Sequence, residues 1–88
     1  DDAITLHERA LAIRRARFGE DHPETARSLH NLGVLLMTRN RPGDLEAARA
    51  ALTSASKTQA ARLGIDHPET ISTLQRLAEL PAPAAKKP

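Results

Sequence analysis

The sequence predicts an all-α protein, and three of its features indicate this fold class. Alanine and leucine, two strong helix formers, supply 28 of the 88 residues. Apolar residues recur along most of the chain at the three- and four-residue spacing of amphipathic helices. The segment at residues 18–33 occurs again at residues 63–78 with eight identical positions, and such internal repeats are typical of helical arrays. We therefore expect about four antiparallel helices within residues 1–80.

The repeated segment predicts the end of one helix, a turn and the start of the next. Gly19 and Gly64 each follow an apolar stretch, where a glycine in the left-handed conformation closes a helix. Asp-His-Pro-Glu-Thr follows in both copies, and we call residues 19–25 and 64–70 the two cassettes. In each cassette we expect the aspartate to cap the next helix, the proline to lie in its first turn and the glutamate to complete a capping box. The predicted caps are Asp21 and Asp66.

The first two helices are expected at residues 3–17 and 25–39. The first carries two adjacent apolar stripes, so we expect other helices to cover it on two sides. These stripes are made of Leu6, Ala10 and Ile13 and of Ile4, Leu11 and Phe18. The second helix carries a single stripe, made of Leu29, Leu32, Gly33 and Leu36.

The other two helices are expected at residues 45–63 and 68–80. Asn40-Arg-Pro-Gly-Asp44 predicts a turn before the third helix, with Asp44 as its cap. The third helix is markedly more polar than the first, and its inward residues are Ala48, Ala51, Leu52 and Ala55. Pro81 ends the fourth helix, and residues 81–88 are expected to form a disordered, extended tail.

The helix pair at residues 25–63 resembles a tetratricopeptide repeat, with leucines and a glycine on the first helix and small residues on the second. The cassette, with Ala10-Leu-Ala-Ile-Arg14 before it and Leu29-His-Asn-Leu-Gly33 after it, is similar to a longer-linker subtype. That subtype is typified by kinesin light chains and by many actinobacterial regulatory proteins. The resemblance covers residues 3–80. It implies an α-solenoid with a half repeat, a full repeat and a second half repeat.

The resemblance also implies a non-enzymatic module for protein–protein interaction. In this family the first helices of successive repeats line a concave face that binds a peptide or a partner helix. The matching residues here are Arg27, His30, Asn31, Val34, Thr38, Ser72, Gln75 and Arg76. Asn31 is either a contact to a bound peptide backbone, as at the matching family position, or a solvated polar residue. Arg76 replaces asparagine at that position in the fourth helix, which is a departure from the family's peptide clamp.

Two half repeats are expected to leave apolar surface uncovered, because each repeat buries its face only against its neighbours. We therefore expect the chain to be the C-terminal part of a larger protein. On its own it should self-associate by pairing or swapping its unpaired helices. An alternative is the sensor region of a STAND-type signalling protein whose ATP- or GTP-binding module lies upstream.

The charge pattern disfavours nucleic-acid binding in spite of a sequence pI near 9.7. All 11 acidic residues lie within residues 1–79, where 11 basic residues balance them, and Lys86 and Lys87 supply the surplus. The arginines of the first helix form either a nucleic-acid patch or a solvated face. We prefer the solvated face, since acidic residues flank them and the chain has only one aromatic residue, Phe18, whereas base stacking uses several.

Catalysis and the binding of a metal or cofactor are not expected. The sequence has no phosphate-binding loop, no nucleophile elbow and no cysteine. We assign His22 and His67 to the cassette turns, His7 to a packed position and His30 to the concave face, which leaves no cluster of metal ligands. No apolar run is long enough to span a membrane and no signal-peptide pattern is present. We therefore expect a cytoplasmic protein that does not bind membranes.

Overall fold

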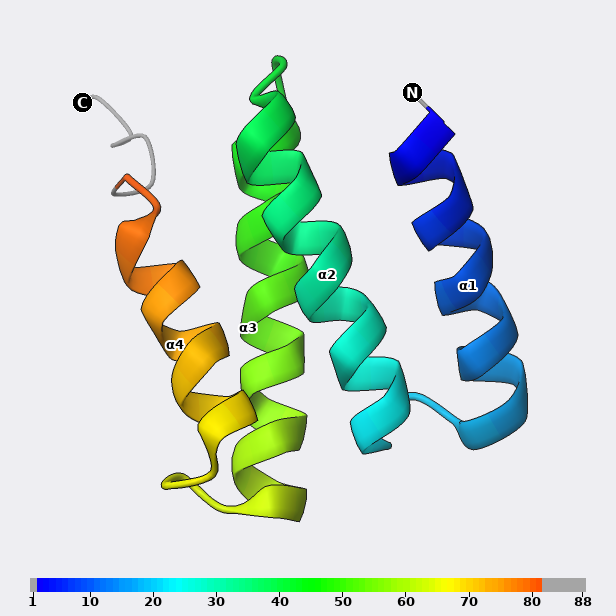
Figure 1. Ribbon diagram of the computed structural model, residues 1–88, viewed down its shortest axis with the longest axis vertical. Helices are drawn as coiled ribbons and strands as arrows, with labels where there is room; N and C mark the ends of the chain where they lie inside the picture. Colours follow the sequence, from blue (N-terminus) through cyan, green and yellow to red (C-terminus); the bar gives the residue numbers. More distant parts are fainter. Residues whose placement is uncertain (1, 82–88) are drawn as a thin grey trace, which may run out of the picture.

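Four α-helices follow one another in the computed structural model, which describes residues 2–81. They are α1 (Asp2–Phe18), α2 (Pro23–Arg39), α3 (Asp44–Leu63) and α4 (Pro68–Glu79), and this part of the chain has no strand. The helices alternate in direction, and each packs against the next along the chain (Figure 1). The all-α prediction is confirmed, and each helix begins and ends within two residues of its predicted bounds. Most of the predicted tail, residues 82–88, lies outside the described residues.

The two cassettes have the same capping geometry, but the predicted caps are wrong. His22 and His67 are the N-cap residues, and the Nδ1 atom of each accepts a hydrogen bond from the main-chain N–H two residues later, at 3.0 and 3.1 Å. The prediction was wrong by one residue. Because proline occupies the first helical position, the N-cap is the residue directly before it, and the aspartates lie one residue too early.

A buried threonine joins the two ends of each cassette. The Thr25 hydroxyl donates to the main-chain oxygen of Gly19 at 2.6 Å, and the Thr70 hydroxyl donates to that of Gly64 at 2.8 Å. Both threonines are fully buried, and both glycines have the positive φ that the sequence predicted. The same five-residue motif therefore forms the same local structure twice, with a hydroxyl holding the helix end to the next helix start.

Asp44 does not cap α3 as predicted; its side chain stabilises the turn between α2 and α3 through hydrogen bonds. The N-cap is Gly43, and Asp44 is the first residue of the helix and is buried. Its carboxylate accepts two hydrogen bonds from the Arg39 guanidinium, at 2.7 and 2.8 Å, and one from the Arg41 main-chain N–H at 2.9 Å. The hydrogen bonds from Arg39 are the main reason why the pKa of Asp44 falls to about 2.

The core lies between α2 and α3, where the two helices pack most extensively. All the residues predicted to face inward on these helices are buried, among them Leu29, Leu32 and Leu52. Gly33 allows the close approach, because a Cβ atom at this position would lie 2.7 Å from Leu52 Cγ. The core is therefore the seam of one complete helix pair, as the sequence predicted.

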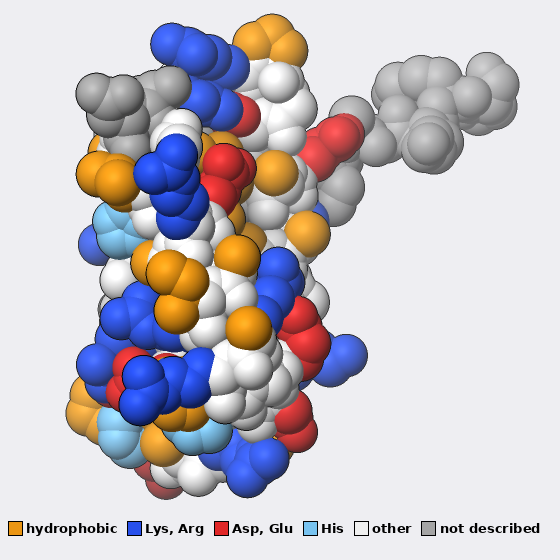
Figure 2. All heavy atoms as spheres, turned by 90° about the vertical axis from the view of Figure 1, so that its right-hand side faces the viewer, with side chains coloured by type: hydrophobic (Ala, Val, Ile, Leu, Met, Phe, Trp, Pro, Cys, Tyr) orange, Lys and Arg blue, Asp and Glu red, His pale blue; other side chains and the backbone are white. Residues whose placement is uncertain are grey.

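Only one of the two apolar stripes of α1 is covered, which corrects the expectation for this helix. Among the described helices α1 contacts α2 alone, and this contact buries Ile4 and Leu11. Leu6 and Ile13 on the other stripe stay 62% and 65% exposed. Apolar side chains accordingly lie open among charged ones on the side of α1 (Figure 2).

Candidate functional site

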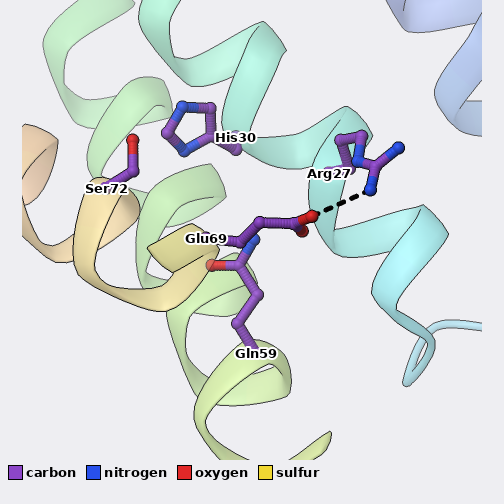
Figure 3. Close-up of a pocket in the computed structure, with 5 residues that line it drawn as sticks. All are labelled: Arg27, His30, Gln59, Glu69 and Ser72. Carbon is purple, nitrogen blue, oxygen red and sulfur yellow. Dashed lines mark hydrogen bonds and ion pairs between the residues drawn. The ribbon is translucent and has the colours of Figure 1, made fainter. Parts of the chain in front are cut away.

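A small pocket lies where α2, α3 and α4 meet, and its walls come from all three helices. It has a volume of about 140 Å³ and is lined by Arg27, His30, Gln59, Glu69 and Ser72. Arg27 and His30 lie one turn apart on α2, Glu69 and Ser72 lie one turn apart on α4, and Gln59 belongs to α3. Figure 3 shows the α2 and α4 side chains facing one another, with the Gln59 amide reaching up beneath Glu69.

Two polar bridges join α2 to α4 across this pocket. An Arg27 Nη2 atom donates to Glu69 Oε2 at 2.8 Å, and the His30 Nδ1 atom lies 2.7 Å from Thr73 Oγ1. The hydrogen bond with Glu69 is the largest of the effects that raise the pKa of Arg27. α2 and α4 make little other contact with each other, and both pack mainly against α3.

His30 and Thr73 share a hydrogen bond between Nδ1 and Oγ1, 2.7 Å apart. The Thr73 hydroxyl also lies within hydrogen-bond distance of the main-chain oxygen of Glu69, at 3.1 Å. The Nε2 atom of His30 has no hydrogen-bond partner within the described part of the chain. Burial lowers the pKa of His30, with a further contribution from the positive charge of Arg76. The imidazole is neutral at pH 7.

Gln59 is the most deeply buried side chain of the pocket, at 1% exposed. Its Oε1 atom is buried and accepts no hydrogen bond within the described part of the chain. Buried polar atoms are nearly always paired, because an unpaired one loses its hydrogen bonds to water without replacement. Gln59 Oε1 is therefore a buried polar atom without a partner on a residue that lines the pocket.

The structure brings some of the predicted partner-binding residues together and leaves others outside the pocket. Arg27, His30 and Ser72 line it. The remaining five predicted residues do not line it; four are exposed and Val34 is half-buried. These five are Asn31, Val34, Thr38, Gln75 and Arg76. Thr38 donates to the Val34 main-chain oxygen at 3.0 Å, and Arg76 pairs with Glu79 at 2.9 Å, so both are engaged within their own helices.

Two pocket residues, Glu69 and Gln59, were missed by the sequence analysis. Glu69 was assigned to a capping box, whereas its carboxylate pairs with Arg27. Gln59 continues the buried stripe of α3, four residues after Ala55 and seven after Leu52. The i, i+4, i+7 spacing was the signal that could have revealed its burial.

The described residues show no further chemical centre. No group of three or more His, Asp or Glu side chains among them is placed to hold a metal ion. Of the four described helices, none is both long and apolar enough to cross a membrane. His22 and His67 serve as helix caps, which agrees with their assignment to the turns, and His7 is half-buried on α1.

Comparison with known proteins agrees with this architecture. A family model described as tetratricopeptide repeat matches residues 1–55. The match spans more than half of the chain and includes α1, the first cassette, α2 and the first part of α3. The second cassette and α4 lie beyond the match. A search of curated proteins gives no match.

Proposed function

Since the chain belongs to the tetratricopeptide repeat family, we propose that it is a non-enzymatic interaction module that binds a protein or peptide partner on the α2–α4 face. Repeats of this family generally mediate protein–protein interaction. The observation that carries the proposal is the convergence of Arg27, His30 and Ser72 from the first helices of two successive repeats on one pocket. Extended peptides suit such a face, because its polar side chains offer both donors and acceptors.

Selection of peptides from a random display library, followed by affinity measurements, tests this proposal. Arg27→Ala and Asn31→Ala should each weaken the binding of the selected peptide. Arg62→Ala is the matched control, since Arg62 lies on α3 and its side chain, like that of Arg27, is 53% exposed and ion-paired. Equal affinities for all four proteins would remove the α2–α4 face from the proposal.

We also propose that the isolated chain self-associates through its uncovered helices. The exposed Leu6 and Ile13 of α1 and the exposed Ile71 and Leu74 of α4 support this. These residues occupy the two ends of the helix array, where the next helix of a longer solenoid would pack. Sedimentation at rising concentration should show association that Leu6→Lys with Ile13→Lys abolishes. A monomer up to high micromolar concentration would contradict it.

The wider setting of the chain is likewise a proposal. We infer a longer-linker subtype, supported by two cassettes with the same cap and the same threonine hydrogen bond. We also infer that the chain lies near the C-terminal end of a larger, cytoplasmic repeat protein, and the uncovered stripe of α1 supports a further helix packed against α1. Further cassettes in the parent sequence would support an array, and a phosphate-binding loop upstream would favour the nucleotide-dependent signalling alternative.

A further inference from the structure

Two of the five side chains that line the pocket have no hydrogen-bond partner among the described residues. Arg27 and Glu69 are paired with each other, and His30 is paired with Thr73. Gln59 Oε1 accepts no hydrogen bond, and no hydrogen bond joins the Ser72 hydroxyl to another described group. The groups of the pocket without a partner are therefore the Gln59 amide, the Ser72 hydroxyl and the Nε2 atom of His30, none of which is charged.

We propose that this pocket is a binding subsite for a carboxamide group, such as the side-chain end of an asparagine or glutamine in the partner. The proposal rests on the proposed function of the α2–α4 face and names the chemistry that one part of it recognises. A carboxamide carries a donor and an acceptor side by side. Its N–H₂ can donate to Gln59 Oε1 while its oxygen accepts from the Ser72 hydroxyl.

The charges around the pocket favour a neutral ligand. Arg27 and Glu69 neutralise each other, and Arg76 is paired with Glu79. A carboxylate would have to draw Arg27 away from Glu69, and an ammonium or guanidinium group would have to compete with Arg27 for that carboxylate. A carboxamide enters without breaking either ion pair, so it avoids the cost of leaving a charge unpaired.

The size and adaptability of the pocket also suit this group. A volume of about 140 Å³ is well above the roughly 10–15 Å³ that a single water needs. Rotation about the terminal torsion of Gln59, which is soft, turns Oε1 toward the opening. Either end of the Gln59 amide can face a carboxamide, because the ligand presents the complementary atom in both orientations.

Three small probes of the same shape and different charge test the proposal: acetamide, acetate and acetamidinium. Each is titrated into the ¹⁵N-labelled chain, and the side-chain resonances of Gln59 and the main-chain resonance of Ser72 are followed by NMR. We expect acetamide alone to shift these resonances saturably. Gln59→Met, which keeps the length of the side chain, and Ser72→Ala should each weaken acetamide binding by about fivefold to tenfold, the equivalent of one lost hydrogen bond.

Ser54→Ala is the matched control, because Ser54, like Ser72, is a half-buried serine, and it lies on α3 outside the pocket. It should bind acetamide as the unmodified chain does, and circular dichroism should show the same helix content in every variant. Tighter binding of acetate or acetamidinium would overturn the carboxamide assignment. Absence of saturable shifts with all three probes, as expected for a pocket that holds water only, would overturn the site.

The test does not depend on a protein partner, so its failure differs from that of the proposed function. If acetamide fails while selected peptides still require Arg27 and Asn31, the face binds peptides without a carboxamide subsite. If acetamide binds while no peptide depends on Arg27 or Asn31, the pocket is a small-ligand site, and the peptide-binding role of the α2–α4 face is wrong.

Discussion

α2 and α4 begin in the same way and end up in different surroundings. Both start after a cassette that differs between the two copies at one position only, with a histidine cap, a proline in the first helical position and a buried threonine that donates to the preceding glycine. Yet Leu29 of α2 is 4% exposed, whereas Leu74, the matching residue of α4, is 39% exposed. The comparison teaches that the cassette determines where a helix starts, while neighbouring helices determine what it buries.

The difference follows from the number of neighbours. α2 lies between α1 and α3 and packs along both, so its leucine stripe is closed on all sides. α4 packs along α3 and meets α2 mainly through the Arg27–Glu69 and His30–Thr73 bridges. One side of α4 is therefore without a helix partner among the described residues, and its apolar residues stay partly exposed.

The largest difference is expected between Leu29→Ala and Leu74→Ala. Truncating the buried Leu29 should lower the free energy of unfolding by about 2–5 kcal/mol, because it removes buried surface and leaves a cavity. Truncating the exposed Leu74 should cost less than about 1 kcal/mol. Urea unfolding followed by circular dichroism measures both, at a protein concentration low enough to limit association. Equal losses would mean that α4 is covered in solution.

Gly33 and Ala78 are the next matched pair, since they occupy the same position in the two copies. Gly33→Ala should destabilise the chain by about 1–3 kcal/mol, because its Cβ must displace Leu52, and this outweighs the better helix propensity of alanine. Ala78→Gly lies on an exposed position and should cost at most about 1 kcal/mol through helix propensity. A stabilising Gly33→Ala would show that the α2–α3 seam is looser than the close contact implies.

Much of this fold is predictable because the cassette is a local signal. Its glycine, proline and threonine fix the backbone over a few residues, and both copies gave the correct helix starts within two residues. The caps were misassigned because Asp21 and His22 are adjacent and both carry acceptors. A shift of one residue decides which of them lies before the proline.

The pocket was less predictable because it depends on three helices meeting. Arg27, His30 and Ser72 follow from the face that the repeat exposes on each first helix. Gln59 lies on α3, the second helix of the complete helix pair. It becomes part of the pocket only because α4 packs against α3 beside α2. The pairing of Glu69 with Arg27 joins positions 42 residues apart, and no local pattern encodes it.

The two histidine caps should contribute equally if the cassettes are equivalent. His22→Ala and His67→Ala are each expected to cost about 0.5–2 kcal/mol, the range for loss of an N-cap side chain. Asp66→Ala should change stability by less than about 0.5 kcal/mol, since Asp66 is not a cap. Asp21→Ala should cost somewhat more, because Asp21 accepts a hydrogen bond from the Thr58 hydroxyl at 3.3 Å. Denaturant unfolding of all four variants compares them, and a larger effect of Asp66→Ala than of His67→Ala would restore the capping role that the sequence predicted.

The smallest effect concerns pH and the bridge between the two helices. Because burial lowers the pKa of His30 in the folded chain, the unfolded chain binds its proton more readily. The contribution of neutral His30 to stability is therefore fully present above the unfolded pKa of about 6.5. This contribution is lost as the pH falls from about 6.5 toward the pKa of His30 in the folded chain. The contribution of Asp44 is lost in a separate, lower range, between its ordinary pKa of 3.8 and about 2.

Thermal unfolding between pH 7 and 5 should therefore show a smaller decrease in stability for His30→Gln than for the unmodified chain. Parallel decreases would show that His30 stays solvated and that the bridge to α4 is open in solution.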